Sequence, residues 1–383
     1  MAETYLDRAG RLAREVQPYV PGATLEEAAR RATGGGPRIA KLSSNESPLG
    51  PSPLAVAAIR ERARHAHYYP SASAPELGAA IARYARVRPE QVVVGGGSST
   101  LMHAIVAAFT TAGGEIISVA PSFAVYGEVA AIHARAPITV PLREEDFGLD
   151  LLRLRAAITP RTQLIFLARP NNPTSTLISI AELEAVAELA DDVGALVVSD
   201  EAYMEFAEAP ARETALMVLR GGQPRWPNVL VTRTFSKAFG LADLRLGYAI
   251  GTPDTARYLR LANVKWPTGA LGQAAALAAL RDRRHLARTL AVVAEGRAWL
   301  AQKFARLGFA VAPRPQGNFI MVDVGSRGWT APDFAAAVFR AARVVVRGDF
   351  SDRHVRISIG RPSENRRLLA AVRQLLESGP GRG

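Results

Sequence analysis

Short apolar runs alternate with helix-like stretches from residue 39 to about residue 265. Apolar runs of this length are typical of buried strands, and the stretches between them carry the helical period. The alternation predicts an α/β fold, with a mostly parallel sheet flanked by helices. The predicted strands are residues 91–94, 115–119, 137–140, 164–168, 195–199, 229–232 and 246–250, and helices are predicted at 101–109, 180–193 and 239–241.

The pattern changes at Lys265-Trp266-Pro267-Thr268-Gly269. Two helices rich in Ala, Leu and Arg are predicted at about 273–280 and 285–307. Strands at 309–312, 319–324, 344–346 and 354–359 then alternate with helices at 333–342 and from residue 363. We therefore predict an N-terminal arm (1–39, with a helix near 25–32), a large domain (40–265) and a smaller α+β domain (266–383) that the arm joins.

Composition narrows the class of protein. The chain has 383 residues, 48% of them hydrophobic, a net charge of +12 and no cysteine. Disulfides, thiolate zinc clusters and cysteine nucleophiles are therefore excluded, and no metal site is predicted. All but four of the basic residues are arginine, and they are scattered, so no nucleic-acid partner is predicted. No apolar leader or membrane-length stretch is evident, so we expect a cytoplasmic protein without a membrane partner.

A glycine turn follows the first predicted strand, and a hydroxyl-rich segment, Ser98-Ser99-Thr100, opens the next helix. The unpaired amides at a helix N-terminus can bind phosphate, and hydroxyls add further donors. The segment is neither Gly-x-Gly-x-x-Gly nor a P-loop. An ordinary turn with a helix cap explains it equally well.

Two later strand ends carry ionisable residues. Asp200 ends one apolar run and Tyr203 follows three residues on, so both can face the crevice at the carboxyl edge of the sheet. A cap on the next helix is the simpler reading of Asp200. Lys237 follows another apolar run, where burial lowers the pKa of a lysine and favours Schiff-base chemistry. The alternative is a lysine that extends to the surface.

Asn172 and two arginines complete the candidate set. Asn172 follows the strand at 164–168, and Arg245 lies eight residues after Lys237. Arg356 lies inside a strand-like run, where a guanidinium needs an anionic partner. That partner can be an internal carboxylate or the carboxylate of a ligand.

The ordered set Asn172, Asp200-x-x-Tyr203, Ser236-Lys237, Arg245 and Arg356 resembles the fold-type I pyridoxal-phosphate (PLP) aminotransferases. The branch resembles the histidinol-phosphate and aromatic amino-acid aminotransferases, and the similarity extends from about residue 19 to about residue 361. The branch signals are Tyr19-Val20-Pro21-Gly22, the run from Leu42 to Pro51, Tyr69-Pro70, Pro121-Ser122-Phe123 and Arg347.

The resemblance implies a catalytic role for three residues. Lys237 would form the Schiff base with PLP and then act as general base and acid. Asp200 would keep the pyridine nitrogen protonated, so that the ring serves as an electron sink. Tyr203, together with Asn172, would hydrogen-bond the phenolic oxygen of the ring, and Phe123 would stack on its face.

The resemblance also implies the remaining contacts of the site. The phosphate would be bound by Ser98, Ser99, Thr100, Thr234, Ser236 and Arg245, and by Tyr69 of a second subunit. The protein would therefore be a homodimer with shared active sites. Arg356 would hold the substrate α-carboxylate, and Tyr19, Asn45, Asn318 and Arg347 would complete the substrate pocket. The reaction would move an amino group from a donor to a 2-oxo acid in a ping-pong cycle.

The chain departs from the pattern of histidinol-phosphate aminotransferases at three places. The glycine turn lacks their two carboxylates, Ser175 replaces a glycine, and Ser47 follows Asn45-Glu46. An aromatic aminotransferase and a PLP decarboxylase of the threonine-phosphate type therefore stay open as alternatives. A basic binding protein with a Rossmann-like sheet is the third alternative, but such a protein has no use for Lys237 among these partners.

Overall fold

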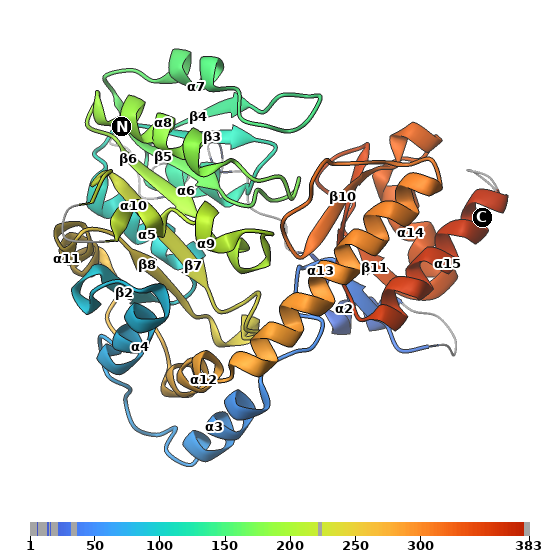
Figure 1. Cartoon of the computed structure of the whole chain (residues 1–383), viewed down its shortest axis with the longest axis horizontal. Helices are drawn as coiled ribbons and strands as arrows, with labels where there is room; N and C mark the ends of the chain where they lie inside the picture. Colours follow the sequence, from blue (N-terminus) through green and yellow to red (C-terminus); the bar gives the residue numbers. More distant parts are fainter. Residues whose placement is uncertain are drawn as a thin grey trace.

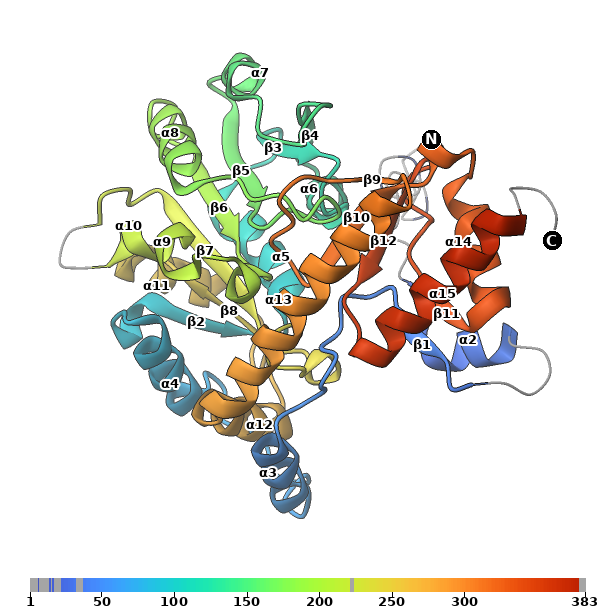
Figure 2. The same ribbon diagram turned by 45° about the vertical axis from the view of Figure 1, so that its right-hand side comes forward.

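The computed structural model describes Leu6, Arg14, Val16 and residues 22–31, 37–220 and 224–378. A larger part contains the central sheet, and a smaller part contains the C-terminal strands and helices (Figure 1). Helix α13 (Arg283–Arg306) runs between the two, and Figure 2 shows the same arrangement from another side. In the ranges that are described, no helix is both long and apolar enough to cross a bilayer.

The larger part is built on a seven-stranded sheet in the order β2-β8-β7-β6-β5-β3-β4. All neighbours are parallel except β8, which is antiparallel to β2 and β7. The strands are β2 (Val92–Gly95), β3 (Glu115–Ala120), β4 (Ala136–Pro141), β5 (Thr162–Ala168), β6 (Leu196–Asp200), β7 (Val229–Thr234) and β8 (Gly247–Ile250). Each corresponds to a strand predicted from the sequence, and the α/β fold class is confirmed.

Helices cover both faces of this sheet. Leu164 and Phe166 of β5 pack into one core with α5 (Ser98–Phe109), α6 (Val125–Ile132) and α11 (Pro253–Ala262). Ile165 and Leu167 face the other core, formed with α4 (Pro75–Ala85), α8 (Ile180–Asp191) and α10 (Leu216–Leu219). Because alternate residues of a strand are buried on opposite faces, the strands appear in the sequence as continuous apolar runs.

The remaining helices of the larger part are α3, α7, α9 and α12. Helix α12 packs on α3 and α4, whereas α7 contacts β4 and α8, and α9 follows the turn after Tyr203. Their bounds are α3 (Pro53–Ala63), α7 (Leu151–Ala157), α9 (Pro210–Glu213) and α12 (Ala270–Arg281). Helix α12 lies after the predicted domain boundary at residue 265, yet it packs against the larger part.

The smaller part contains a three-stranded antiparallel sheet, β12-β10-β9, and a parallel pair, β1-β11. Helices α2, α14 and α15 belong to it (Figure 2). Strand β1 pairs with β11 in parallel, with Ala40 beside Val344. Residues 40–42 therefore belong with the C-terminal part rather than with the large sheet. The domain bounds stay a prediction. The elements are α2 (Leu25–Arg31), β1 (Ala40–Leu42), β9 (Ala310–Val311), β10 (Phe319–Asp323), α14 (Ala331–Ala342), β11 (Val344–Val346), β12 (His354–Ser358) and α15 (Pro362–Ser378).

The helix predicted at 239–241 is wrong. The chain instead makes a tight turn after Lys237, and a 3-10 turn follows at Ala242–Leu244. Gly240 has φ +67° in this turn, and a Cβ there would lie 2.5 Å from the carbonyl oxygen of Gly50. Only a glycine fits this backbone and this close approach, so the apolar residues around it form a compact turn.

Candidate active site

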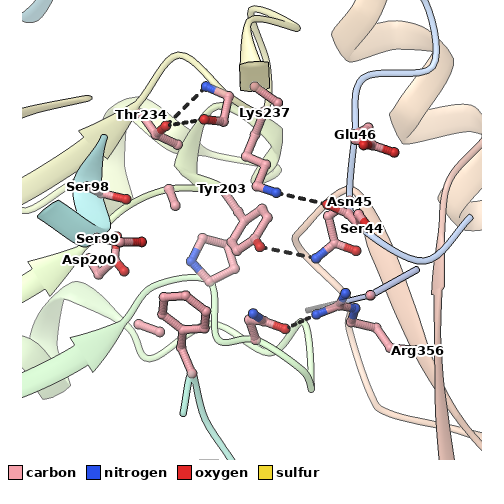
Figure 3. A pocket seen from close by; sticks show the side chains of 18 of the residues that line it. Ser44, Asn45, Glu46, Ser98, Ser99, Asp200, Tyr203, Thr234, Lys237 and Arg356 are labelled. Atoms are coloured by element: carbon pink, nitrogen blue, oxygen red, sulfur yellow. Dashed lines mark hydrogen bonds between the residues drawn. The ribbon is translucent and has the colours of Figure 1, made fainter. Parts of the chain in front are cut away.

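The carboxyl ends of β5, β6 and β7 meet at a cavity of about 320 Å³. In the sheet register Ala168 lies beside Asp200, and Asp200 lies beside Thr232. The cavity lining also includes residues 44–46, Arg347 and Arg356, and Figure 3 shows residues 44–46 and Arg356 on the side opposite Ser98 and Asp200. Its wall includes the predicted residues Asn45, Ser98, Ser99, Phe123, Asn172, Asp200, Tyr203, Thr234, Ser236, Lys237, Arg245, Arg347 and Arg356.

The N-terminus of α5 forms one end of the cavity. Its N-cap residue, Gly97, has φ +98° and supplies no capping side chain, so the first amides of this twelve-residue helix are left for another acceptor. Gly247 on β8 allows this approach, because a Cβ there would lie 2.5 Å from the amide nitrogen of Ser98. Arg245 lies beside Gly97, because a Cβ added at Gly97 would be 3.0 Å from the Arg245 guanidinium.

Hydroxyl groups also line this end of the cavity. The Thr234 hydroxyl donates to the Ser236 hydroxyl over 2.9 Å, and the Ser236 amide donates to the Thr234 oxygen over 3.0 Å. Unpaired helix amides, hydroxyls and a guanidinium together form a binding site for an anion such as phosphate.

Lys237 points across the middle of the cavity (Figure 3). Its Nζ donates to the carbonyl oxygen of Ser44 over 3.0 Å and lies 5.7 Å from the centre of the Tyr203 ring. The amino group donates to a neutral acceptor in a cavity whose lining includes aromatic and hydroxyl groups. A lysine in such a position is accessible for covalent chemistry with a carbonyl compound.

Asp200 is a buried carboxylate at the end of β6. It accepts hydrogen bonds from the Tyr126 hydroxyl (2.9 Å) and the Thr232 hydroxyl (3.2 Å). Burial raises the pKa of Asp200 to about 6, and these two hydrogen bonds act in the opposite direction. Within the described structure this carboxylate makes no ion pair with a protein cation, which leaves its charge for a cationic ligand group.

Tyr203 is held by a second buried network. Asn45 Nδ2 donates to the Tyr203 hydroxyl over 3.1 Å, and Asn318 Nδ2 donates to the Asn45 carbonyl oxygen over 2.9 Å. Burial raises the pKa of Tyr203, so the hydroxyl keeps its proton and serves as a hydrogen-bond donor. Asn45 itself has φ +53°, a conformation that asparagine tolerates better than most residues.

Arg347 and Arg356 lie opposite each other on neighbouring extended segments. The Arg347 amide donates to the Arg356 carbonyl over 3.0 Å, and the reverse bond measures 2.8 Å. Arg356 donates to Asn172 Oδ1 and to the Ser43 carbonyl, each over 2.5 Å, and Arg347 pairs with Asp349. Both side chains are buried and both line the cavity.

Four predicted residues are not on this wall. Thr100 donates to the Gly96 carbonyl within its own turn, and Asn318 is fully buried behind Asn45. Tyr69 is 85% exposed and pairs with the ring of Trp266 at a centroid distance of 5.6 Å. Tyr19 lies outside the described residues.

Three ionisable residues of the cavity lining, Lys41, Glu46 and Tyr126, were not among the predicted site residues. Tyr126, whose hydroxyl donates to Asp200, lies three residues after the predicted Phe123. In a helix this spacing places two side chains on the same face, so it could have indicated Tyr126. Lys41 and Glu46 line the cavity as an ion pair of 2.6 Å. Lys41 is one of only four lysines, but no pattern in the sequence linked it to strand ends more than 100 residues away.

The donor set fits PLP group by group. The α5 amides, Thr234, Ser236 and Arg245 suit its phosphate, and Asp200 suits a protonated ring nitrogen. Asn172 and Tyr203 suit its phenolic oxygen, and Lys237 suits its aldehyde. Phe123 lines the same cavity and offers an aromatic face. Among the described residues, no group of three His, Cys, Asp or Glu side chains could hold a metal ion.

Comparison with known proteins agrees with this geometry. The family model for aminotransferase class I and II matches residues 37–372. A histidinol-phosphate aminotransferase of Anaeromyxobacter sp. is 41% identical over 361 residues, which cover 94% of this chain and 96% of that protein. An aromatic amino acid aminotransferase of Thermobifida fusca is 39% identical over 360 residues and 94% of each chain.

A solved structure shows the same fold. The crystal structure of histidinol-phosphate aminotransferase from Sinorhizobium meliloti in complex with pyridoxal-5'-phosphate has a TM-score of 0.82 and 29% identity. The match covers 96% of this chain and 97% of that one. With the family model, these relatives and the cavity in agreement, the chain belongs to the class I and II aminotransferases and is a PLP-dependent enzyme.

Proposed function

We propose that the enzyme transfers the amino group of histidinol phosphate to a 2-oxo acid. Its similarity to histidinol-phosphate aminotransferases, at 41% and 36% identity over nearly the whole chain, supports this donor. The relatives reported above are aminotransferases, so decarboxylation is not favoured. The aromatic amino acids remain the comparison donors in the test below.

The observation that carries the proposal is the facing pair Arg347 and Arg356. Like charges directly opposite each other on neighbouring strands destabilise a protein unless anions lie between or beside them. Asp349 neutralises part of this charge, and Arg356 donates to the amide oxygen of Asn172 and to the Ser43 carbonyl. Two guanidinium groups suit a phosphate dianion, which accepts several charge-assisted hydrogen bonds at once.

The same pair also suits the second half of the cycle. A 2-oxo acid presents a carboxylate next to its reacting carbon, and Arg356 can bind that carboxylate with two parallel hydrogen bonds. Histidinol phosphate has no carboxylate, so its phosphate would take this place. One site can therefore bind donor and acceptor in turn, as a ping-pong reaction requires.

Once PLP is bound, it supplies the electron sink that lets a C–H bond next to the amino group break. Lys237 Nζ would take the proton from the donor carbon and return it to the cofactor side, because it is the basic group in the middle of the cavity. The Asp200 carboxylate would hold a proton on the ring nitrogen, and the Tyr203 hydroxyl and Asn172 amide would donate to the phenolic oxygen. Arg356 and Arg347 would orient the substrate.

The test uses Arg347→Gln in the PLP-loaded enzyme. We expect KM for histidinol phosphate to rise about 10- to 100-fold, since the loss of a buried charge-assisted contact costs roughly 1.5–3 kcal/mol. KM for L-phenylalanine, whose one anionic group is its carboxylate, should change less. Arg340→Gln, an exposed residue of α14, is the matched control and should change neither value. An equal rise for both donors, or none for histidinol phosphate, would contradict a phosphate role for Arg347.

We also propose a homodimer in which Tyr69 reaches the phosphate end of the partner's site. The support is its unusual exposure, 85%, beside the half-exposed ring of Trp266. Sedimentation of the purified enzyme should give twice the mass of one chain, and a monomer that turns over at full rate would exclude the shared site. A cytoplasmic location remains a prediction, which cell fractionation checks.

A further inference from the structure

Ser175 adopts a backbone conformation that favours glycine. Its φ is +65°, and the residue is fully buried three positions after Asn172. A residue other than glycine or asparagine in this region costs about 1 kcal/mol or more. At this position, a hydrogen bond of the serine side chain can offset the cost of the positive φ.

The Ser175 hydroxyl makes that contact with the segment that precedes β10. The Gly317 amide donates to Ser175 Oγ over 2.8 Å, and the Gln316 amide donates to the Ser175 carbonyl over 2.7 Å. On its own side, the Ser175 amide donates to the Asn171 carbonyl over 2.8 Å. Ser175 thus connects the loop after β5, in the large sheet, to the start of the small antiparallel sheet.

The segment it holds leads directly to the substrate cavity. Gly317 is followed by Asn318, which donates to the Asn45 carbonyl, and Asn45 donates to the Tyr203 hydroxyl. The Ser358 hydroxyl, on β12 two residues after Arg356, donates to Asn45 Oδ1 over 2.8 Å. One hydrogen-bonded path therefore joins Ser175 to Tyr203 and to the strand that carries the substrate arginine.

Other hydrogen bonds also hold this segment, and they limit the effect expected from loss of the Ser175 hydroxyl. Arg297 donates to the Gly317 carbonyl over 3.0 Å, and the Glu208 amide donates to Gln316 Oε1 over 2.8 Å. Loss of the Ser175 hydroxyl would therefore loosen the segment rather than release it. The Gly317 amide is the group left without an acceptor, and it belongs to a buried residue where water does not easily replace the hydroxyl.

We propose that Ser175 is a positioning residue for substrate binding, because its hydroxyl holds the Gly317–Asn318 segment, and through it Asn45, in the arrangement that closes the cavity. This role rests on the aminotransferase activity and not on which donor is used. Ser175 does not line the cavity, so it acts through the residues that do.

The test compares Ser175→Gly with Ser175→Ala. Both variants lose the hydroxyl, whereas only glycine removes the steric cost of the positive φ. We expect hydrogen exchange of the Gly317 amide to accelerate at least tenfold in both PLP-loaded variants. KM for the amino donor should rise about three- to tenfold in both, with kcat changing less than twofold. Thermal stability should be higher for Ser175→Gly than for Ser175→Ala.

Two results would overturn the proposal. If Ser175→Gly keeps wild-type exchange at Gly317 and wild-type KM, the hydroxyl does not position the segment. If only Ser175→Ala is impaired, the residue matters for its backbone and not for its hydroxyl. Exchange at Gly317 needs no substrate, so this readout still tests the hydroxyl if histidinol phosphate and phenylalanine both prove not to be donors.

Discussion

At the residue scale, the site depends on where charge is left uncompensated. Asp200 is a buried carboxylate that accepts hydrogen bonds from two hydroxyls and a backbone amide, and burial raises its pKa to about 6. Such a group is unfavourable for the fold and useful for binding a cation, as is common at functional sites. The sequence indicated Asp200 and Lys237 because each is an ionisable residue near the end of a short apolar run.

Asp200→Asn tests this reading in the cofactor-free protein. The folded-state pKa is raised from 3.8 to about 6, so the ionised carboxylate lowers stability above pH 6, by up to about 3 kcal/mol. This penalty disappears as the pH falls from about 6 to about 4, since the native state then binds the proton. Asp200→Asn should therefore be more stable than wild type at pH 7, and the difference should vanish near pH 4.

Urea unfolding at both pH values measures the difference. The same variant, loaded with PLP, should lose nearly all turnover while its circular dichroism is unchanged, because an amide cannot keep the ring nitrogen protonated. A variant that is less stable than wild type at pH 7, or one that turns over normally, would show that Asp200 is a structural residue.

At the scale of elements, strands were the easiest feature to predict. Six of the seven strands of the large sheet are largely buried, whereas the edge strand β4 is mostly exposed. Strands that are buried on both faces appear as continuous apolar runs with little ambiguity. The turn after Lys237 was predicted as a helix because periodicity does not reveal that Gly240 meets the Gly50 carbonyl. The left-handed conformation of Ser175 was equally hidden, because serine gives no sign of a positive φ.

The approach of β8 to the start of α5 gives a prediction at this scale. Gly247→Ala would place a Cβ 2.5 Å from the Ser98 amide nitrogen, so the helix N-terminus must shift. We expect PLP affinity to fall at least tenfold in equilibrium dialysis. Gly78→Ala in α4, where a Cβ meets nothing within 4 Å, is the control and should leave affinity unchanged and stability equal or slightly higher. Wild-type affinity in Gly247→Ala would mean that the α5 amides do not bind the phosphate.

At the scale of the whole molecule, the cavity exists because distant segments meet. Asn45 lies against Tyr203 and Ser358, and Arg356 lies against Asn172. These contacts span 158 to 313 positions of the chain, and no local pattern predicts them. The sequence could therefore name most wall residues through a family resemblance, but not Lys41, Glu46 or Tyr126, and it could not show that Asn318 lies behind the wall.

The most direct test of the account is the visible absorbance of the PLP-loaded protein as histidinol phosphate is added, with Lys237→Ala as the comparison. Wild type should have the absorbance of a lysine Schiff base, and the donor should bleach it. Lys237→Ala should lack that absorbance from the start and show no turnover. A Schiff-base absorbance that persists in Lys237→Ala would contradict the central assignment, and a wild-type absorbance that histidinol phosphate leaves unchanged would contradict the proposed donor.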